Sequence, residues 1–252
     1  MDNLADRSWI FNSVAKEATL KLLCQKVEAY FDFPRTRVCR YFADADDRYF
    51  VDWHGPHFRG FHAPFSVRPR LPYYLVECFF HPHSATKAFD HVIYIRHSTC
   101  DDPTGLVMTY AHELQHVVQQ TTMPRLLEVN QILKQHLKEF APNAVAIDVP
   151  HERQANIVSK LVAEEICGAE AVRKFADEQI KFMQNEGDYE QKARWIFFRD
   201  VASSTPYDLL KHTLPLVEKY KQKIDFGIDV SKPEWWVGPL KKCSQRKQYV
   251  TG

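Results

Sequence analysis

The chain has 252 residues, of which 45% are hydrophobic and 26% are charged, the ordinary composition of a water-soluble globular protein. Its net charge of +1 argues against a nucleic-acid partner or a membrane surface, and no apolar run approaches the length of a membrane span. Six cysteines without a C-x-x-C pair, and an N-terminus with acids among its apolar residues, predict a cytoplasmic protein with reduced thiols.

The first hundred residues are predicted to form one amphipathic helix followed by short strands. Apolar residues recur at helical spacing over 13–31, which indicates a helix. Residues 36–80 are rich in aromatic side chains, Pro and His and lack a helical period, so strands joined by Pro-bearing loops fit best. The β-branched segment DHVIYIR at 90–96 predicts one more strand.

The next predicted element is a capped amphipathic helix. Asp102 is a favourable N-cap, and Pro103 suits the first helical position. The helix is expected to run to about Gln120 and to stop before Pro124. One apolar stripe is predicted to pack on the sheet, and it consists of Leu106, Tyr110, Leu114, Val117 and Val118.

The rest of the chain is predicted to be mainly helical. Helices are expected at about 123–140, from just past Pro150 to near Gly168, onward to about 183, over 188–202, and over 205–223. The order helix, strands, helices predicts an α+β fold with a small early antiparallel or mixed sheet. We expect a single domain over 1–252, with an aromatic-rich α/β part over about 1–100 and a helical part over about 101–252.

The segment YAHELQHVVQQ at 110–120 places two histidines four residues apart. On a helix, His112 and His116 lie one turn apart, so both imidazoles can reach a single ion. Glu113 lies beside them, where its carboxylate can contact a metal-bound water rather than the metal. This arrangement is typical of a catalytic zinc site, with two neutral imidazole ligands and a base next to the water. A chance occurrence of the pattern on a surface helix is the alternative.

A tetrahedral catalytic site needs one more protein ligand. Thr122 stands where the metzincin spacing would place a third histidine. Glu152, on the first turn of a later predicted helix, is the favoured ligand, with His151 as the alternative. A surface glutamate at a helix N-terminus is a further interpretation of Glu152. Asn156, one turn along the same face, could accept the outer ring N–H of His112 and fix its tautomer.

These motifs resemble those of a known family. H-E-x-x-H followed by E-x-x-A-N on a later helix is similar to the glutamate-type zinc metallopeptidases (gluzincins), and most similar to the ImmA/IrrE-type proteins. The segments that carry the resemblance are VIYIR, YAHELQH and ERQANIVSKLV, within about residues 90–167. The resemblance implies a zincin-like fold, Zn²⁺ as cofactor, His112, His116 and Glu152 as ligands, and Glu113 as the catalytic residue. Gln115 stands where the family motif has a small residue.

The leading hypothesis is therefore a zinc-dependent metalloendopeptidase that acts on a protein or peptide substrate. Glu113 would act as general base and then as general acid. Tyr207, His212 and Tyr110 are candidates for the donor that stabilises the oxyanion. By analogy with zincins, the strand at 91–96 would be an edge strand that binds extended substrate.

Two other functional classes stay open. One is a non-hydrolytic zinc-binding regulatory or interaction protein on a peptidase scaffold, although such a protein would not need Glu113. The other is a zinc hydrolase of a small-molecule amide or ester, which a closed pocket would favour over an open groove. A second metal site among the histidines of the aromatic region, which include His57 and His62, is the less favoured interpretation of that cluster.

Overall fold

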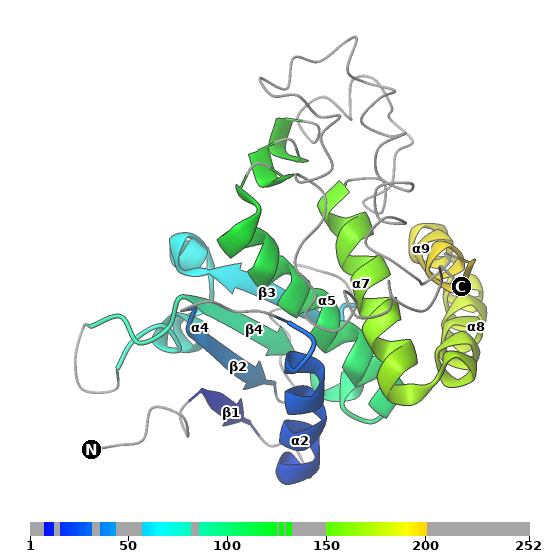
Figure 1. Ribbon diagram of the computed structural model, residues 1–252, viewed down its shortest axis with the longest axis horizontal. Helices are drawn as coiled ribbons and strands as arrows, with labels where there is room; N and C mark the ends of the chain where they lie inside the picture. The colour runs from blue at the N-terminus through cyan, green and yellow to red at the C-terminus, as the bar shows by residue number, and fades with distance from the viewer. Residues whose placement is uncertain are drawn as a thin grey trace, which may run out of the picture.

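The computed structural model describes residues 8–12, 16–31, 36–43, 57–81, 86–124, 126–128, 130–132 and 150–200 (Figure 1). In this part of the chain a small mixed sheet is packed against helices, so the predicted α+β class is confirmed. None of the helices described there combines the length and apolar character that crossing a bilayer requires.

The sheet has four strands. Their spatial order is β1 (Trp9–Phe11), β2 (Val38–Phe42), β4 (His91–Ile95) and β3 (Gly60–Pro64). β1 pairs with β2, and β2 with β4, in parallel, whereas β3 runs antiparallel to β4. Helix α2 (Glu17–Glu28) lies between β1 and β2 in the chain, as the connection of two parallel strands requires.

The strand predicted at 90–96 is β4, and it occupies the interior of the sheet. All five of its residues are buried, because it has a strand on each side and packed side chains on both faces. The expectation that this strand is an exposed edge is therefore wrong. The edge beside it is β3, which within the described sheet pairs with β4 alone.

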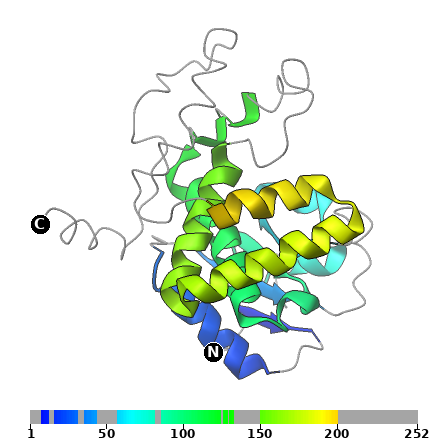
Figure 2. The same ribbon diagram turned by 90° about the vertical axis from the view of Figure 1, so that its right-hand side faces the viewer.

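Helix α5 (Pro103–Thr122) is the centre of the helical layer. It packs on β3 and β4, with α2 and α7 (Pro150–Cys167) against it (Figure 1). Helices α8 (Ala169–Glu186) and α9 (Tyr189–Asp200) lie side by side beyond α7 (Figure 2). The shorter elements are the helix α4 (Tyr73–Glu77) and the 3₁₀ turns η1 (Phe65–Arg70) and η2 (His97–Thr99).

The predicted start of α5 is confirmed. The Asp102 side chain accepts a hydrogen bond of 2.7 Å from the backbone N–H of Gly105, and Pro103 is the first helical residue. A Cβ on Gly105 would lie 2.2 Å from Arg59 Nη2 and 2.8 Å from the Phe175 ring. The glycine therefore lets these two side chains approach the first turn of α5, and a larger residue would displace them.

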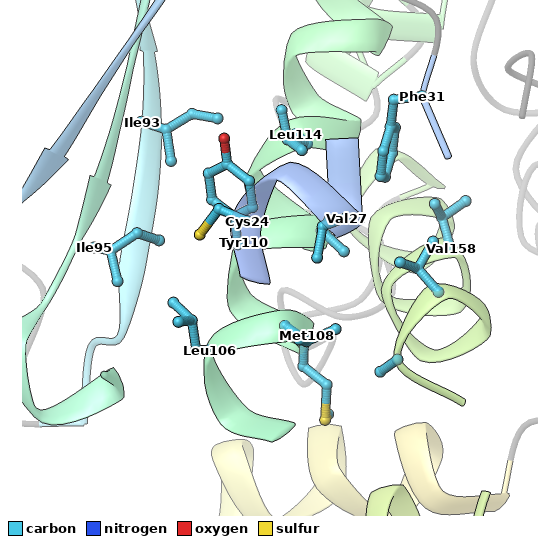
Figure 3. Close-up of a cluster of buried hydrophobic side chains, with 14 of the residues drawn as sticks. Cys24, Val27, Phe31, Ile93, Ile95, Leu106, Met108, Tyr110, Leu114 and Val158 are labelled. Carbon is cyan, nitrogen blue, oxygen red and sulfur yellow. The ribbon is translucent and has the colours of Figure 1, made fainter. Parts of the chain in front are cut away.

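The main core lies between the sheet, α5, α2 and α7 (Figure 3). The whole apolar stripe predicted on α5 is buried in it, as is Phe31, which follows α2. Ile93 and Ile95 of β4 face α5, and Val158 of α7 contributes from the opposite side (Figure 3). A second cluster of buried hydrophobic side chains includes Phe79 and Tyr94. Aromatic side chains therefore fill much of the interior.

The strands predicted over 36–80 are confirmed in part: β2 and β3 lie there, but η1 and α4 lie within residues 65–77, with Pro72 directly before α4. Strand β1 was not predicted.

The predicted helices agree with the structure within a few residues where they are described. The helix expected past Pro150 ends at Cys167, and α8 and α9 match the two expected helices that follow it. Of the helix expected at about 123–140, helical residues are described only between 124 and 132. The helix expected over 205–223 lies outside the described residues.

Candidate metal centre

Helices α5 and α7 bring the predicted ligands together. His112 and His116 lie one turn apart on α5, and Glu152 lies on the first turn of α7. Ala155 is fully buried, and its small side chain suits the close packing of the two helices. Ligand atoms of His112, His116 and Glu152 all lie within 4.8 Å of one another, which is the arrangement that a metal ion requires.

The distances within this group fit a tetrahedral ion. His112 Nε2 lies 3.0 Å from His116 Nε2 and 3.3 Å from Glu152 Oε2, and His116 Nε2 lies 3.7 Å from Glu152 Oε1. Two ligand atoms at about 2.0–2.1 Å from a tetrahedral zinc ion are about 3.3 Å apart. The observed spacings lie on either side of this value, so the residues present could hold a divalent cation with little rearrangement.

The charge states of the three side chains also suit a bound cation. Burial lowers the pKa of His112 and lowers that of His116 to about 3, so both imidazoles are neutral at pH 7 and have a nitrogen lone pair to offer. Burial alone would raise the pKa of Glu152, but contacts with His116, His112 and His151 outweigh it and hold this pKa well below its ordinary value. Two neutral imidazoles and one carboxylate therefore converge.

Glu113 lines the same cavity as the three predicted ligands and is itself buried. Burial, and then the negative charge of Glu152, raise the pKa of Glu113 to about 8, although the charge of Arg194 and a hydrogen bond from the His62 backbone oppose them. A cation nearby would lower this pKa, because an opposite charge favours the carboxylate. Glu113 is thus placed to gain and to lose a proton near neutral pH.

A buried glutamine network supports His116. Its Nδ1 lies 2.8 Å from Gln119 Oε1, which leaves Nε2 facing the other ligands. Gln119 Nε2 donates to Gln154 Oε1 at 2.7 Å and to the His151 carbonyl at 2.9 Å, and Gln115 Nε2 donates to Gln154 Oε1 at 3.0 Å. Sequence reasoning missed this network, although the position of Gln119 three residues after His116 was a signal for it.

Asn156 has a different contact from the one predicted. Its Oδ1 accepts a hydrogen bond of 3.2 Å from Arg194 Nη2 and none from a ring nitrogen of His112. The reason is that α9 places Arg194 beside both residues, with Nη2 also 3.5 Å from His112 Nε2. Asn156 therefore hydrogen-bonds to the Arg194 guanidinium rather than to His112. No local sequence signal linked Arg194 to the site.

The structure describes two of the four remaining candidate residues, His151 and Tyr110. His151 Nε2 contacts Glu152 Oε1 at 3.1 Å, so His151 supports the carboxylate and lies outside the converging group of three. The Tyr110 hydroxyl contacts Glu28 and Arg40 in the core, so the expectation that it faces the site is wrong. Tyr207 and His212 lie outside the described residues.

A cavity of about 500 Å³ opens over the ligand group. Its lining comes from the edge strand β3 and the residues before it, from α5, from the start of α7 and from α9. Its apolar lining includes Phe58, Met108, Trp195 and Phe198. The cavity therefore places the edge strand β3, the His112, His116 and Glu152 group and an apolar surface within reach of one molecule.

A second pair of histidines borders the cavity. His62 Nε2 lies 2.8 Å from His91 Nδ1, and the His62 ring centroid lies 6.4 Å from that of His116. Burial lowers the pKa of both, that of His91 to about 4. Among the described residues, the group of His112, His116 and Glu152 is the one that could hold an ion, so this pair gives no support to a second metal site.

No family model, curated protein or solved structure matches the chain. The class that fold and site define is therefore an α+β protein with a His, His, Glu group that could bind a metal ion.

Proposed function

We propose that the protein is a zinc-dependent endopeptidase. The observation that carries this proposal is the convergence of His112, His116 and Glu152 on one point, with the Glu113 carboxylate in the same cavity. A site that only binds metal needs the three ligands and has no use for a fourth, buried acid beside them. The pairing of a ligand group with a titratable base is instead what hydrolysis requires.

The donor set favours zinc over other divalent ions. Two imidazole nitrogens and one carboxylate suit a four-coordinate ion, whereas calcium and magnesium prefer shells of oxygen ligands. Three protein ligands leave one position open, which distinguishes a catalytic zinc site from a closed structural one. The outer hydrogen bond from His116 to Gln119 is the support that ligating histidines commonly have.

When bound, zinc supplies Lewis acidity to the attacking water and to the scissile carbonyl. Glu113 takes a proton from the water as its oxygen adds to the carbonyl carbon. It then delivers that proton to the amide nitrogen as the carbon–nitrogen bond breaks. Burial raises the pKa of Glu113 to about 8 in the metal-free protein, and a bound cation would lower it from there, which supports a role in taking up and releasing a proton.

The peptide would bind along β3. This strand lines the cavity and is the edge of the described sheet next to the predicted ligands, so backbone groups on its outer side could pair with an extended substrate, although the His62 backbone already contacts Glu113. Side chains that alternate along the peptide would then point toward the ligand group or away from it. In this proposal β3 binds the substrate, a role that the sequence had suggested for the strand at 91–96.

A second candidate has one observation in its favour. A volume of about 500 Å³ lies within the range of about 300–1,000 Å³ of pockets for small ligands, so the substrate could instead be a small-molecule amide or ester. Both candidates use the same ligands and the same base, and they differ in the substrate alone.

The decisive experiment compares wild type with Glu113→Gln. Zinc content is measured after dialysis, and hydrolysis is measured on a peptide library and on a panel of small amides and esters. We expect about one zinc per chain in both proteins, and hydrolysis by wild type that falls at least 100-fold in the variant. Zinc in both proteins with no hydrolysis by wild type would refute an enzyme in favour of a binding protein. Cleavage of the small compounds alone would refute the peptidase.

A further inference from the structure

We infer that Arg194 is a catalytic residue that donates a hydrogen bond to the carbonyl oxygen of the substrate as negative charge develops on it. This inference rests on the proposed hydrolytic function. It assigns the donor for which sequence reasoning considered Tyr207, His212 and Tyr110. It also gives α9, which contributes no ligand, a part in the reaction.

The position of Arg194 is the first argument. Its Nη2 lies 3.5 Å from His112 Nε2, the nitrogen that faces the other two ligands, and Arg194 lines the cavity over them. Asn156 Oδ1 accepts from the same Nη2 at 3.2 Å and fixes the guanidinium in place. An ion bound at His112 would take the nitrogen that Nη2 now faces, which would leave an N–H of Arg194 beside the ion for a carbonyl oxygen of the substrate.

The charge of Arg194 is the second argument. Among the described residues no carboxylate forms an ion pair with it, and its hydrogen-bond contacts are Asn156 and His112, both through Nη2. Arg199, five residues later on α9, is neutralised by Asp177 and Asp200. Glu113 feels the charge of Arg194 across the cavity but forms no ion pair with it, so the guanidinium keeps N–H groups that an oxygen of the substrate could accept from.

Asn156 adds a second donor. It is 3% exposed and lines the cavity, and its Nδ2 is buried without a hydrogen-bond partner. A buried N–H group with no acceptor costs free energy unless a ligand completes it. The anion that Arg194 attracts would supply the missing acceptor in this part of the cavity.

The step balances without a further reactant. The water oxygen adds to the carbonyl carbon, its proton moves to Glu113, and the electron pair of the carbonyl π bond moves onto the carbonyl oxygen. Arg194 donates hydrogen bonds to that oxygen and keeps its protons. The electron pair then returns to re-form the carbonyl, the carbon–nitrogen bond breaks, and Glu113 returns its proton to the nitrogen. Donors placed where charge develops are a major source of catalysis.

The test compares Arg194→Met and Arg194→Lys with the matched control Arg199→Met on the same helix. Zinc content, kcat and KM are measured on a peptide that wild type cleaves. As a readout separate from activity, each protein is loaded with Co²⁺ and titrated with acetate, and binding is followed by the visible absorption of the ion. Acetate is the probe because its carboxylate presents an oxygen anion to the ion and the arginine together.

We expect Arg194→Met to keep its zinc and to lose about 10²–10³ in kcat, with KM changed by only a few-fold. Its affinity for acetate should fall at least tenfold. Arg194→Lys should recover part of both losses, because it keeps the charge but not the planar geometry. Arg199→Met should match wild type in kcat and in acetate affinity.

Three results would overturn the inference. Unchanged kcat and acetate affinity in Arg194→Met would remove Arg194 from the reaction while leaving the proposed function intact. Loss of zinc from that variant would make Arg194 a support of the ligand group. A rise in KM confined to peptides with a free C-terminal carboxylate, and absent for their amides, would make it a residue that binds the substrate terminus. If wild type cleaves no substrate, the proposed function fails, and the acetate titration by itself decides whether Arg194 binds an oxygen anion beside the ion.

Discussion

His116 Nδ1 lies 2.8 Å from Gln119 Oε1, so the ring nitrogen that faces away from the ligand group is held by a neighbour on the same helix. Gln119 is in turn fixed by Gln154 and by the His151 carbonyl on α7. The tautomer of His116, a predicted ligand on α5, therefore depends on hydrogen bonds between helices.

Replacing Gln119 should weaken metal binding without removing a ligand. Gln119→Leu loses the acceptor for the His116 N–H, and we expect zinc affinity to fall by about 10–100-fold in a chelator competition. Gln119→Glu keeps an acceptor and should bind zinc at least as tightly as wild type. Gln184→Leu, on the exposed face of α8, is the matched control and should leave the affinity unchanged. Equal affinities in all four proteins would show that Gln119 does not orient the ligand.

Two substitutions at the start of α7 separate the predicted ligand from its alternative. Glu152→Ala removes a carboxylate that lies 3.3 Å from His112, so we expect stoichiometric zinc binding to be lost at micromolar concentration. His151→Gln removes only a contact to that carboxylate and should cost less than tenfold in affinity. Zinc content after dialysis is the measurement. The reverse pattern would identify His151 as the third ligand.

The buried His62–His91 pair should make the metal-free protein sensitive to acid. Burial lowers the pKa of His91 from 6.5 to about 4, so between these values the unfolded chain binds a proton that the folded chain does not. The free energy of unfolding therefore falls as pH falls from about 6.5 to 4, by as much as about 3 kcal/mol for this residue.

Urea unfolding at pH 7.5 and pH 5 measures this dependence in the presence of a chelator. His91→Gln cannot titrate, so its free energy of unfolding should fall less between the two pH values than that of wild type. His97→Gln, in the turn η2, is the control and should retain the wild-type dependence. An identical loss in wild type and in His91→Gln would contradict the expectation.

Tyr110→Phe should affect stability and leave catalysis alone. The Tyr110 hydroxyl accepts from Arg40 Nε at 2.9 Å and donates to Glu28. Tyr110 is not among the described residues that line the cavity. Loss of the hydroxyl leaves polar partners incompletely satisfied, so we expect unfolding to become easier by about 1–3 kcal/mol. The rate of peptide hydrolysis should stay within twofold of wild type. A 100-fold loss of kcat with unchanged stability would restore Tyr110 as an oxyanion donor.

The sequence predicted those parts of the site whose signal is the spacing of residues close together in the chain. Asp102 and Pro103 mark the start of α5, and the four-residue interval from His112 to His116 places both rings on one face. Glu152 was found because its helix carries a recognisable pattern of its own. In each case a few consecutive residues contain the whole signal.

The parts that the sequence did not predict depend on tertiary packing. Arg194 reaches the ligands only because α9 folds back along α8, and nothing near residue 194 specifies that path. The interior position of β4 follows from the pairing of β3 on its far side, which no local pattern dictates. The apolar run at 92–95, without polar alternation, was, however, a sequence sign of a central strand, and the analogy with zincins was preferred to it.

The packing of α5 on α7 through Ala155 ties the ligands to the tertiary structure, since imidazoles and carboxylate meet only when these helices are docked. An ion held by residues of both helices would act as a reversible cross-link that unfolding must break. Each tenfold rise in free ion above its dissociation constant would then stabilise the folded chain by about 1.4 kcal/mol. The melting temperature would report how much zinc is available, whether or not a substrate is present.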